Sequence, residues 1–191
     1  MLAGKGFKKV FNVAGGINAW QSQTAVGPQD LGMDLFTGKE APLDVLKVAY
    51  SLEQGLRDFY VTMEKQATLE KVKDLFAKLS DIEVKHQRSI YLAYNDISPE
   101  AVSKEAFEKM VEIKALEGGL STREYLDLFK PDLNSPTQVI SLAMSIEAQA
   151  LDLYQRVSLK IKRLESRKII NKIANEEKAH LASLGKLMDS L

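Results

Sequence analysis

An internal repeat is the strongest constraint on what this chain can fold into. The segment "SLEQGLRDFY", residues 51–60, aligns without gaps to "SIEAQALDLY", residues 145–154, and the two share Ser, Glu, Asp and Tyr. The same offset of 94 residues separates Glu83 from Glu177 and His86 from His180. We therefore expect two similar halves, derived from a duplication and related by a pseudo-twofold axis.

Four segments carry apolar residues at helical spacing, and we expect helices at about 42–66, 69–94, 136–160 and 166 to the end. Pro42 suits a first helical position. Ser135 is expected to cap the third helix, with Pro136 at its first position and Gln138 completing a capping box.

The connections between these helices differ in length. Only a few residues join the first helix to the second and the third to the fourth, whereas about 40 residues separate the second from the third. Within that long connection, Ser98-Pro99 and Ser121-Thr122 look like the starts of short helices, and the Lys/Glu-rich stretch 104–117 looks like an exposed helix face. Two short hairpins around one long crossover indicate an all-α, ferritin-like four-helix bundle.

The first 41 residues do not share the helical pattern. A short apolar run at 10–14, bounded by glycines, predicts a strand followed by a turn, so that residues 1–20 would form a small appendage. Residues 21–41 are rich in Gly, Gln, Thr and Pro, as in a linker. The predicted organisation is thus appendage 1–20, linker 21–41 and bundle 42–191.

Composition excludes several classes of function. Charge is balanced at 26 basic and 26 acidic residues, so the chain lacks the basic surface of a nucleic-acid binder. The absence of cysteine excludes zinc–thiolate sites, thiolate nucleophiles and Cys-ligated iron within this chain. No apolar run reaches the roughly 18–20 residues of a membrane helix, and no signal peptide is apparent, so we expect a cytoplasmic protein.

Both histidines follow a glutamate by three residues, in the pairs Glu83–His86 and Glu177–His180, and each pair shares one helix face. Glu53 and Glu147 occupy equivalent positions on the other two helices. In an antiparallel bundle all four glutamates would lie at about the same height, and burying them together requires compensating positive charge. Two divalent cations would supply it, so we predict six metal ligands: Glu53, Glu83, His86, Glu147, Glu177 and His180.

Two alternatives to this prediction stay open. The pairs could be local Glu–His contacts on helix surfaces, or the site could keep its residues and bind no metal. Tyr60 and Tyr154, each seven residues after a predicted ligand, should face the same interior. They are candidate catalytic residues, for hydrogen bonding to a carboxylate or for one-electron chemistry, although core tyrosines are common. Glu176 should point away from Glu177, into solvent.

The segments "SLEQGLRDFY", "IEVKHQ", "SIEAQALDLY" and "NEEKAH" resemble the rubrerythrin branch of the ferritin-like superfamily, over about residues 42–191. The resemblance implies a non-haem di-iron peroxidase active in oxidative stress. It would reduce hydrogen peroxide, or react with dioxygen, using electrons from an external, rubredoxin-like donor protein. Its two iron ions, or manganese or a mixed pair, would be held by the six residues named above, in a protein that we expect to be a homodimer.

The chain departs from the rubrerythrin pattern in two ways. Rubrerythrins typically carry an extra glutamate three residues after the third-helix ligand, where this chain has Ala150. They also carry a Cys-ligated rubredoxin domain, which a chain without cysteine cannot form. The expected ligand set is therefore the simpler one that resembles bacterioferritin centres.

The N-terminal stretch "LAGKGFKKVFNVAGGINAW" resembles the end of a rhodanese domain, which suggests a remnant of a rhodanese–rubrerythrin fusion. Without cysteine, no sulfurtransferase activity is expected. Two other functions remain as alternatives to a di-iron oxidoreductase: an iron-handling, ferroxidase-like module, and a structural bundle with a redox-inactive metal.

Overall fold

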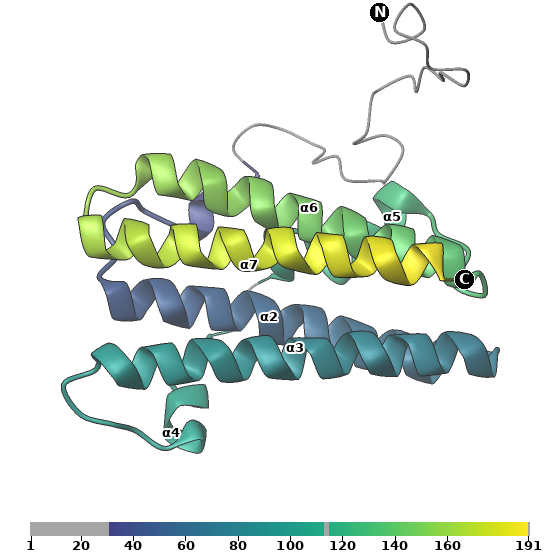
Figure 1. The fold of residues 1–191 in the computed structure, drawn as a ribbon, viewed down its shortest axis with the longest axis horizontal. Coiled ribbons are helices and arrows are strands. Elements are labelled where there is room, and N and C mark those ends of the chain that lie inside the picture. The colour runs from purple at the N-terminus through teal and green to yellow at the C-terminus, as the bar shows by residue number, and fades with distance from the viewer. Residues whose placement is uncertain (1–30, 113–114, 191) are drawn as a thin grey trace, which may run out of the picture.

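The computed structural model describes residues 31–112 and 115–190, and within these it contains helices and no strands. Four long helices, α2 (Pro42–Gln66), α3 (Glu70–Ile97), α6 (Pro136–Lys160) and α7 (Leu164–Asp189), lie side by side as a bundle (Figure 1). Their bounds agree closely with the four predicted segments. The predicted strand and the rhodanese-like stretch lie outside the described residues.

The bundle is built from two antiparallel hairpins. α2 packs against α3 and α6 packs against α7, and the hairpins meet through contacts of α2 with α7 and of α3 with α6. α2 and α7 run in one direction and α3 and α6 in the other (Figure 1). This arrangement is consistent with the ferritin-like bundle expected from the connectivity.

The crossover between α3 and α6 contains two short α-helices, α4 (Lys104–Glu108) and α5 (Thr122–Phe129), and a 3-10 turn, η3 (Glu117–Gly119). Ser121 caps α5 with a full capping box, as predicted. The start predicted at Ser98-Pro99 was wrong. Ser98 ends α3 by donating its N–H to Tyr94 O, and the next helix begins after Ser103, whose hydroxyl caps it.

Two further local predictions need correction. Ser135 does cap α6, but the Gln138 side chain accepts from the Asp132 N–H instead of closing a capping box. The stretch 104–117 is not one exposed helix face, since α4 is short and buries Phe107 completely. That ring packs against Tyr50, Tyr91 and Tyr94, which fastens the crossover to α2 and α3.

The described part of the predicted linker, residues 31–41, packs against the α6–α7 end of the bundle. It contains a short 3-10 turn, η2 (Met33–Leu35), and the fully buried Phe36. Lys160 Nζ donates to the carbonyl oxygens of Met33 and Phe36, and Ser166 Oγ donates to Glu40 O. These contacts seat the segment where α6 ends and α7 begins.

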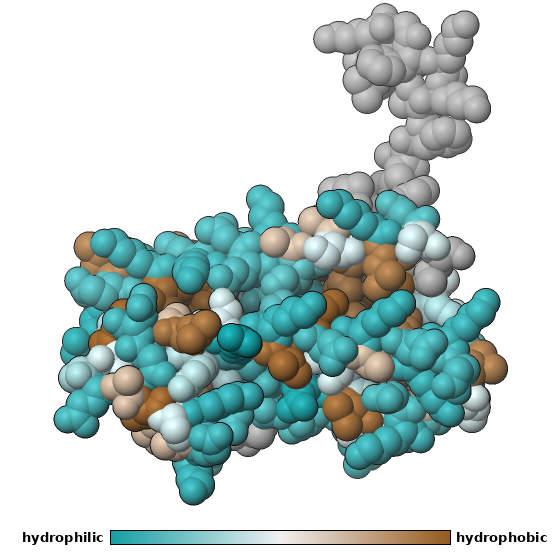
Figure 2. All heavy atoms as spheres, turned by 60° about the horizontal axis from the view of Figure 1, so that its bottom comes forward, coloured by the Kyte–Doolittle hydropathy of each residue, from teal (hydrophilic) through white to brown (hydrophobic). Residues whose placement is uncertain are grey.

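The buried apolar residues form two clusters, one toward each end of the bundle. Tyr60 and Leu79 belong to one cluster, and Tyr154 and Ile173 to the other. On the outside, the view with α3 brought forward shows hydrophobic residues in separate patches among hydrophilic ones (Figure 2). Among the described residues, no helix combines the length and apolar character needed to cross a membrane.

Candidate metal centre

The region between the two apolar clusters is polar, because each long helix contributes one buried glutamate there. Glu53, Glu83, Glu147 and Glu177 are each only 1–2% exposed. The helical repeat explains the convergence: the glutamates sit near the middle of each helix, on the face turned toward the partner hairpin. A buried carboxylate is costly unless it is paired or bound to a cation, so four at one level require compensation.

The six predicted ligands form two groups of the same composition. Glu53, Glu83 and His86 make one group, and the equivalent residues make the other: Glu147, Glu177 and His180. Within each group, one candidate ligand atom from each residue lies within 4.8 Å of the others. The structure therefore brings together all six side chains, in two sets related by the 94-residue offset.

Each histidine directs Nδ1 at two carboxylates. His86 Nδ1 lies 2.9 Å from Glu83 Oε2 and 3.3 Å from Glu53 Oε2. His180 Nδ1 lies 3.0 Å from Glu177 Oε2 and 3.6 Å from Glu147 Oε2. An imidazole nitrogen converging with two carboxylate oxygens is a donor set that suits iron, manganese or zinc.

The two groups meet at the histidines. The rings of His86 and His180 stack in parallel, with centroids 3.5 Å apart and planes within 2°. Their side chains are 14% and 17% exposed, whereas the glutamates are almost wholly enclosed. The imidazoles thus form the outer edge of the site, between α3 and α7.

Two glutamate oxygens at the centre lie near a histidine Nδ1 but lack a well-aligned hydrogen bond. Among the described residues, Glu53 Oε2 and Glu147 Oε2 are inaccessible to solvent and accept no hydrogen bond of good geometry. Such atoms are rare in folded proteins and call for an unseen ion or water. A cation held between each glutamate and its neighbouring Glu-x-x-His pair would satisfy them, so the residues fit a two-metal centre.

The electrostatics of the protein without metal point the same way. Burial raises the pKa of Glu53 well above its ordinary value, with repulsion from Glu83 adding to the effect. Burial and repulsion from Glu147 raise the pKa of Glu83 in the same manner. For His86, burial lowers the pKa, but hydrogen bonding and attraction to Glu53 outweigh it and leave the pKa raised.

Glu147 differs from the other two carboxyls. Burial acts to raise its pKa, but hydrogen bonds involving His180 and Glu177 outweigh burial and leave the pKa lowered. In the metal-free centre, protons are therefore held more tightly by Glu53, Glu83 and His86 than by Glu147. Metal binding would displace those protons and replace them with positive charge.

Among protein families, residues 44–188 match rubrerythrin. The chain belongs to the rubrerythrin family. The match covers the bundle and does not extend to the N-terminal stretch that resembled rhodanese, so that resemblance gains no support. No curated protein and no solved structure matches the chain significantly.

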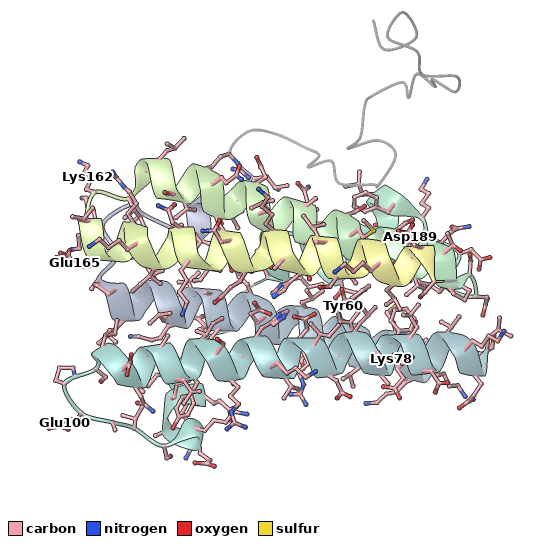
Figure 3. All side chains as sticks on the ribbon, in the orientation of Figure 1. Tyr60, Lys78, Glu100, Lys162, Glu165 and Asp189 are labelled. Carbon is pink, nitrogen blue, oxygen red and sulfur yellow. The ribbon has the colours of Figure 1, made fainter. Side chains whose placement is uncertain are left out.

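The tyrosines and two other positions named from the sequence, Ala150 and Glu176, have different surroundings in the structure. Tyr60 and Tyr154 are buried, at 1% and 0% exposure, and Tyr60 lies inside the bundle (Figure 3). Ala150, at the position of the extra glutamate of rubrerythrins, is fully buried against the crossover, where a Cβ on Gly118 would stand 3.2 Å from its backbone nitrogen. Glu176 faces outward and lies 3.9 Å from Lys172 Nζ.

Sequence reasoning missed the cavity next to this centre. It encloses about 180 Å³ and is lined by one glutamate from each group, both histidines and five further residues: Leu79, Ile82, Ser183, Leu184 and Leu187. It also missed the buried Gln87, whose amide donates to Gln54 Oε1 at 3.1 Å beside the ligands of α2 and α3. The amphipathic pattern marks these residues as inward-facing and does not separate cavity walls from packed core.

The raised pKa values predict how the metal-free protein responds to pH. When the pKa of a group is higher in the folded than in the unfolded protein, its contribution to stability is full below the unfolded pKa. That contribution is lost as the pH rises through the folded pKa. The raised pKa values of Glu53, Glu83 and His86 all act in this direction. The lowered pKa of Glu147 changes the stability only at pH values below the ordinary pKa of a glutamate. We expect the melting temperature of the metal-free protein to fall by roughly 5 °C or more between pH 5 and pH 8.

Thermal unfolding in the presence of a chelator measures this dependence. A Glu53→Gln/Glu83→Gln variant, which keeps the shape of both side chains and removes their titration, should show a much flatter profile. A melting temperature that rises over this range in the unmodified protein would contradict the electrostatic account.

Proposed function

We propose that this protein is a non-haem di-iron oxidoreductase that reduces hydrogen peroxide, or reacts with dioxygen, with electrons from an external donor protein. The observation that carries the proposal is the convergence of two Glu, Glu-x-x-His groups at the centre of a rubrerythrin-family bundle. Glu53, Glu83 and His86 would hold one ion, and Glu147, Glu177 and His180 the other. When bound, two ferrous ions would supply the two electrons that peroxide reduction requires.

The protein's own residues would prepare the reaction in three ways. The glutamates can change between one-oxygen and two-oxygen binding, which accommodates a change in metal charge. The two apolar clusters on either side of the centre exclude bulk water from it. The outward-facing imidazole edges leave a side on which a small oxidant can approach.

Tyr60 and Tyr154 are our candidates for catalytic residues beyond the ligands. Each lies two helical turns after a proposed ligand glutamate and is buried in a different apolar cluster. A phenol in such a position can donate a hydrogen bond to a carboxylate or supply one electron and one proton. Because the two tyrosines lie on opposite sides of the centre, their contributions can be separated by single substitutions.

The test is anaerobic single-turnover oxidation of the ferrous-loaded protein. We expect peroxide to oxidise the centre rapidly, with about one peroxide consumed per two irons, and dioxygen to act more slowly. Tyr60→Phe and Tyr154→Phe should keep full iron content, and at least one should slow the peroxide step by about tenfold. A much faster reaction with dioxygen would redirect the assignment, and large closed shells that accumulate iron would favour an iron-handling role.

The proposed electron donor is a separate, rubredoxin-like protein, and the composition of the chain supports this proposal. The chain has no cysteine, so it contains no Cys-ligated iron that could return electrons to the centre. Steady turnover would need electrons from outside the residues of this bundle, which a rubredoxin-like donor could supply. We also propose that the protein acts as a homodimer, which equilibrium sedimentation can test.

A further inference from the structure

The cavity beside the proposed metal centre has a rim, a floor and an end wall of different character. Ile82, Ser183 and Leu187 are partly exposed or exposed and form the rim, while Leu79 and Leu184 are buried at 1% and 4% exposure and form the floor. The end wall consists of the two imidazoles together with Glu83 and Glu147. The cavity therefore leads from the surface, between α3 and α7, to ligands of both proposed metal positions.

The approach to the centre is apolar. Four of the five residues outside the end wall are Leu or Ile. The fifth, Ser183, donates its hydroxyl proton to Ala179 O at 3.0 Å, one turn earlier on its own helix. Hydrogen peroxide, which exchanges hydrogen bonds with water, gains nothing from such walls, whereas a short alkyl group leaving water would be stabilised by them.

The size of the cavity suits such a group. Apolar cavities of about 150 Å³ lined by Leu, Ile and Phe are known to admit a molecule of the size of benzene. At about 180 Å³, this cavity has room for a branched alkyl group of a few carbons, with a polar head at the end wall.

The pseudo-twofold symmetry is broken at this place. The 94-residue offset relates Ile82 to Glu176, Leu187 to Ala93 and Ser183 to Ser89. The side related by symmetry thus carries a charged residue and a small one where the cavity has Ile82 and Leu187. The apolar rim belongs to one side of the centre and is not a general consequence of the repeat.

We propose that this cavity binds the alkyl group of a short-chain organic hydroperoxide and presents its O–O bond to the metal centre. The inference rests on the proposed di-iron function and extends its substrate class from hydrogen peroxide to peroxides that carry a short alkyl group. In the reaction, the O–O bond breaks and two protons are taken up from solvent, giving an alcohol and water, while two ferrous ions are each oxidised by one electron. Leu79, Ile82, Leu184 and Leu187 determine specificity for the alkyl group.

The first test measures binding without turnover. Protein loaded with zinc, which is redox-inactive, and labelled at its Leu and Ile methyl groups is titrated with tert-butanol, the alcohol that tert-butyl hydroperoxide would yield. We expect saturable NMR shifts at the methyls of the four specificity residues. Ser183→Phe, which places a ring at the exposed rim, should abolish these shifts. Ser89→Phe, its symmetry-related control at another exposed position, should leave them intact.

The second test uses the ferrous-loaded protein. Ser183→Phe should slow oxidation by tert-butyl hydroperoxide by about tenfold or more and oxidation by hydrogen peroxide by less than about threefold, while Ser89→Phe changes neither. Shifts that are absent, or that persist in Ser183→Phe, would overturn the proposal, as would equal slowing of both oxidants. Zinc content measured on the same samples separates the two ideas: two zinc ions without methyl shifts reject only the cavity proposal, whereas no bound metal rejects the di-iron function.

Discussion

Replacing both histidines, in a His86→Ala/His180→Ala variant, is expected to reduce the iron content from about two ions per chain to well below one. Each imidazole is the only nitrogen donor of its group, and its Nδ1 lies within 3.6 Å of two carboxylates. Loss of a ligand that completes a metal site typically weakens binding by orders of magnitude. Elemental analysis of protein purified from iron-replete cells measures the effect.

A control variant distinguishes loss of ligands from loss of fold. Glu176→Gln alters a neighbour of a proposed ligand, on the same helix, whose carboxylate faces outward to Lys172. It should keep both irons. The double histidine variant should keep its helical circular dichroism, because the substituted rings lie at the edge of the site. Unchanged iron content in that variant would mean that the metal lies elsewhere.

Phe107→Ala is expected to have the largest effect on stability, a loss of about 3–5 kcal/mol in the free energy of unfolding. The ring is fully buried, meets Tyr50 edge-on with centroids 4.9 Å apart, and lies 4.7 Å from the Tyr94 ring. No other residue of the short helix α4 is buried. Removal of the Phe107 ring would leave a cavity and release the crossover from α2 and α3.

Chemical denaturation of the metal-free protein measures this loss. Met110→Ala, three residues later in the same crossover and 44% exposed, is the matched control and should change stability by less than about 0.5 kcal/mol. A loss below about 1 kcal/mol for Phe107→Ala would show that the crossover is not fastened at this ring.

The fold was predictable from the sequence because its main signal is repeated. The spacing of Glu53, Glu83, Glu147 and Glu177 places one glutamate per helix, and hydrophobic periodicity with caps such as Ser135 bounds the four helices closely. The grouping of these glutamates with His86 and His180 followed from the same register. Long periodic segments predict helices well because apolar residues recur at every helical turn, so the same signal is present many times.

Predictions failed where a local signal competed with tertiary contacts. Ser98-Pro99 has the composition of a helix start, yet the cap that formed is Ser103, and burial of Phe107 fixes the helix there. The Gln138 side chain could accept a hydrogen bond from the Ser135 N–H in a capping box or from the turn before it. In the structure it accepts from the Asp132 N–H. Phe36 lies in a segment without periodicity, so its burial could not be read from pattern. The cavity exists because Ile82, Leu187 and the other lining side chains leave space unfilled between α3 and α7. How completely side chains fill space depends on packing, which sequence spacing does not describe.

The most direct test of the account is a crystal structure of iron-loaded protein with anomalous data collected at the iron edge. We expect two anomalous peaks per chain, one among Glu53, Glu83 and His86 and the other among Glu147, Glu177 and His180. A single peak, peaks away from these six side chains, or none in crystals grown from iron-replete protein would contradict it.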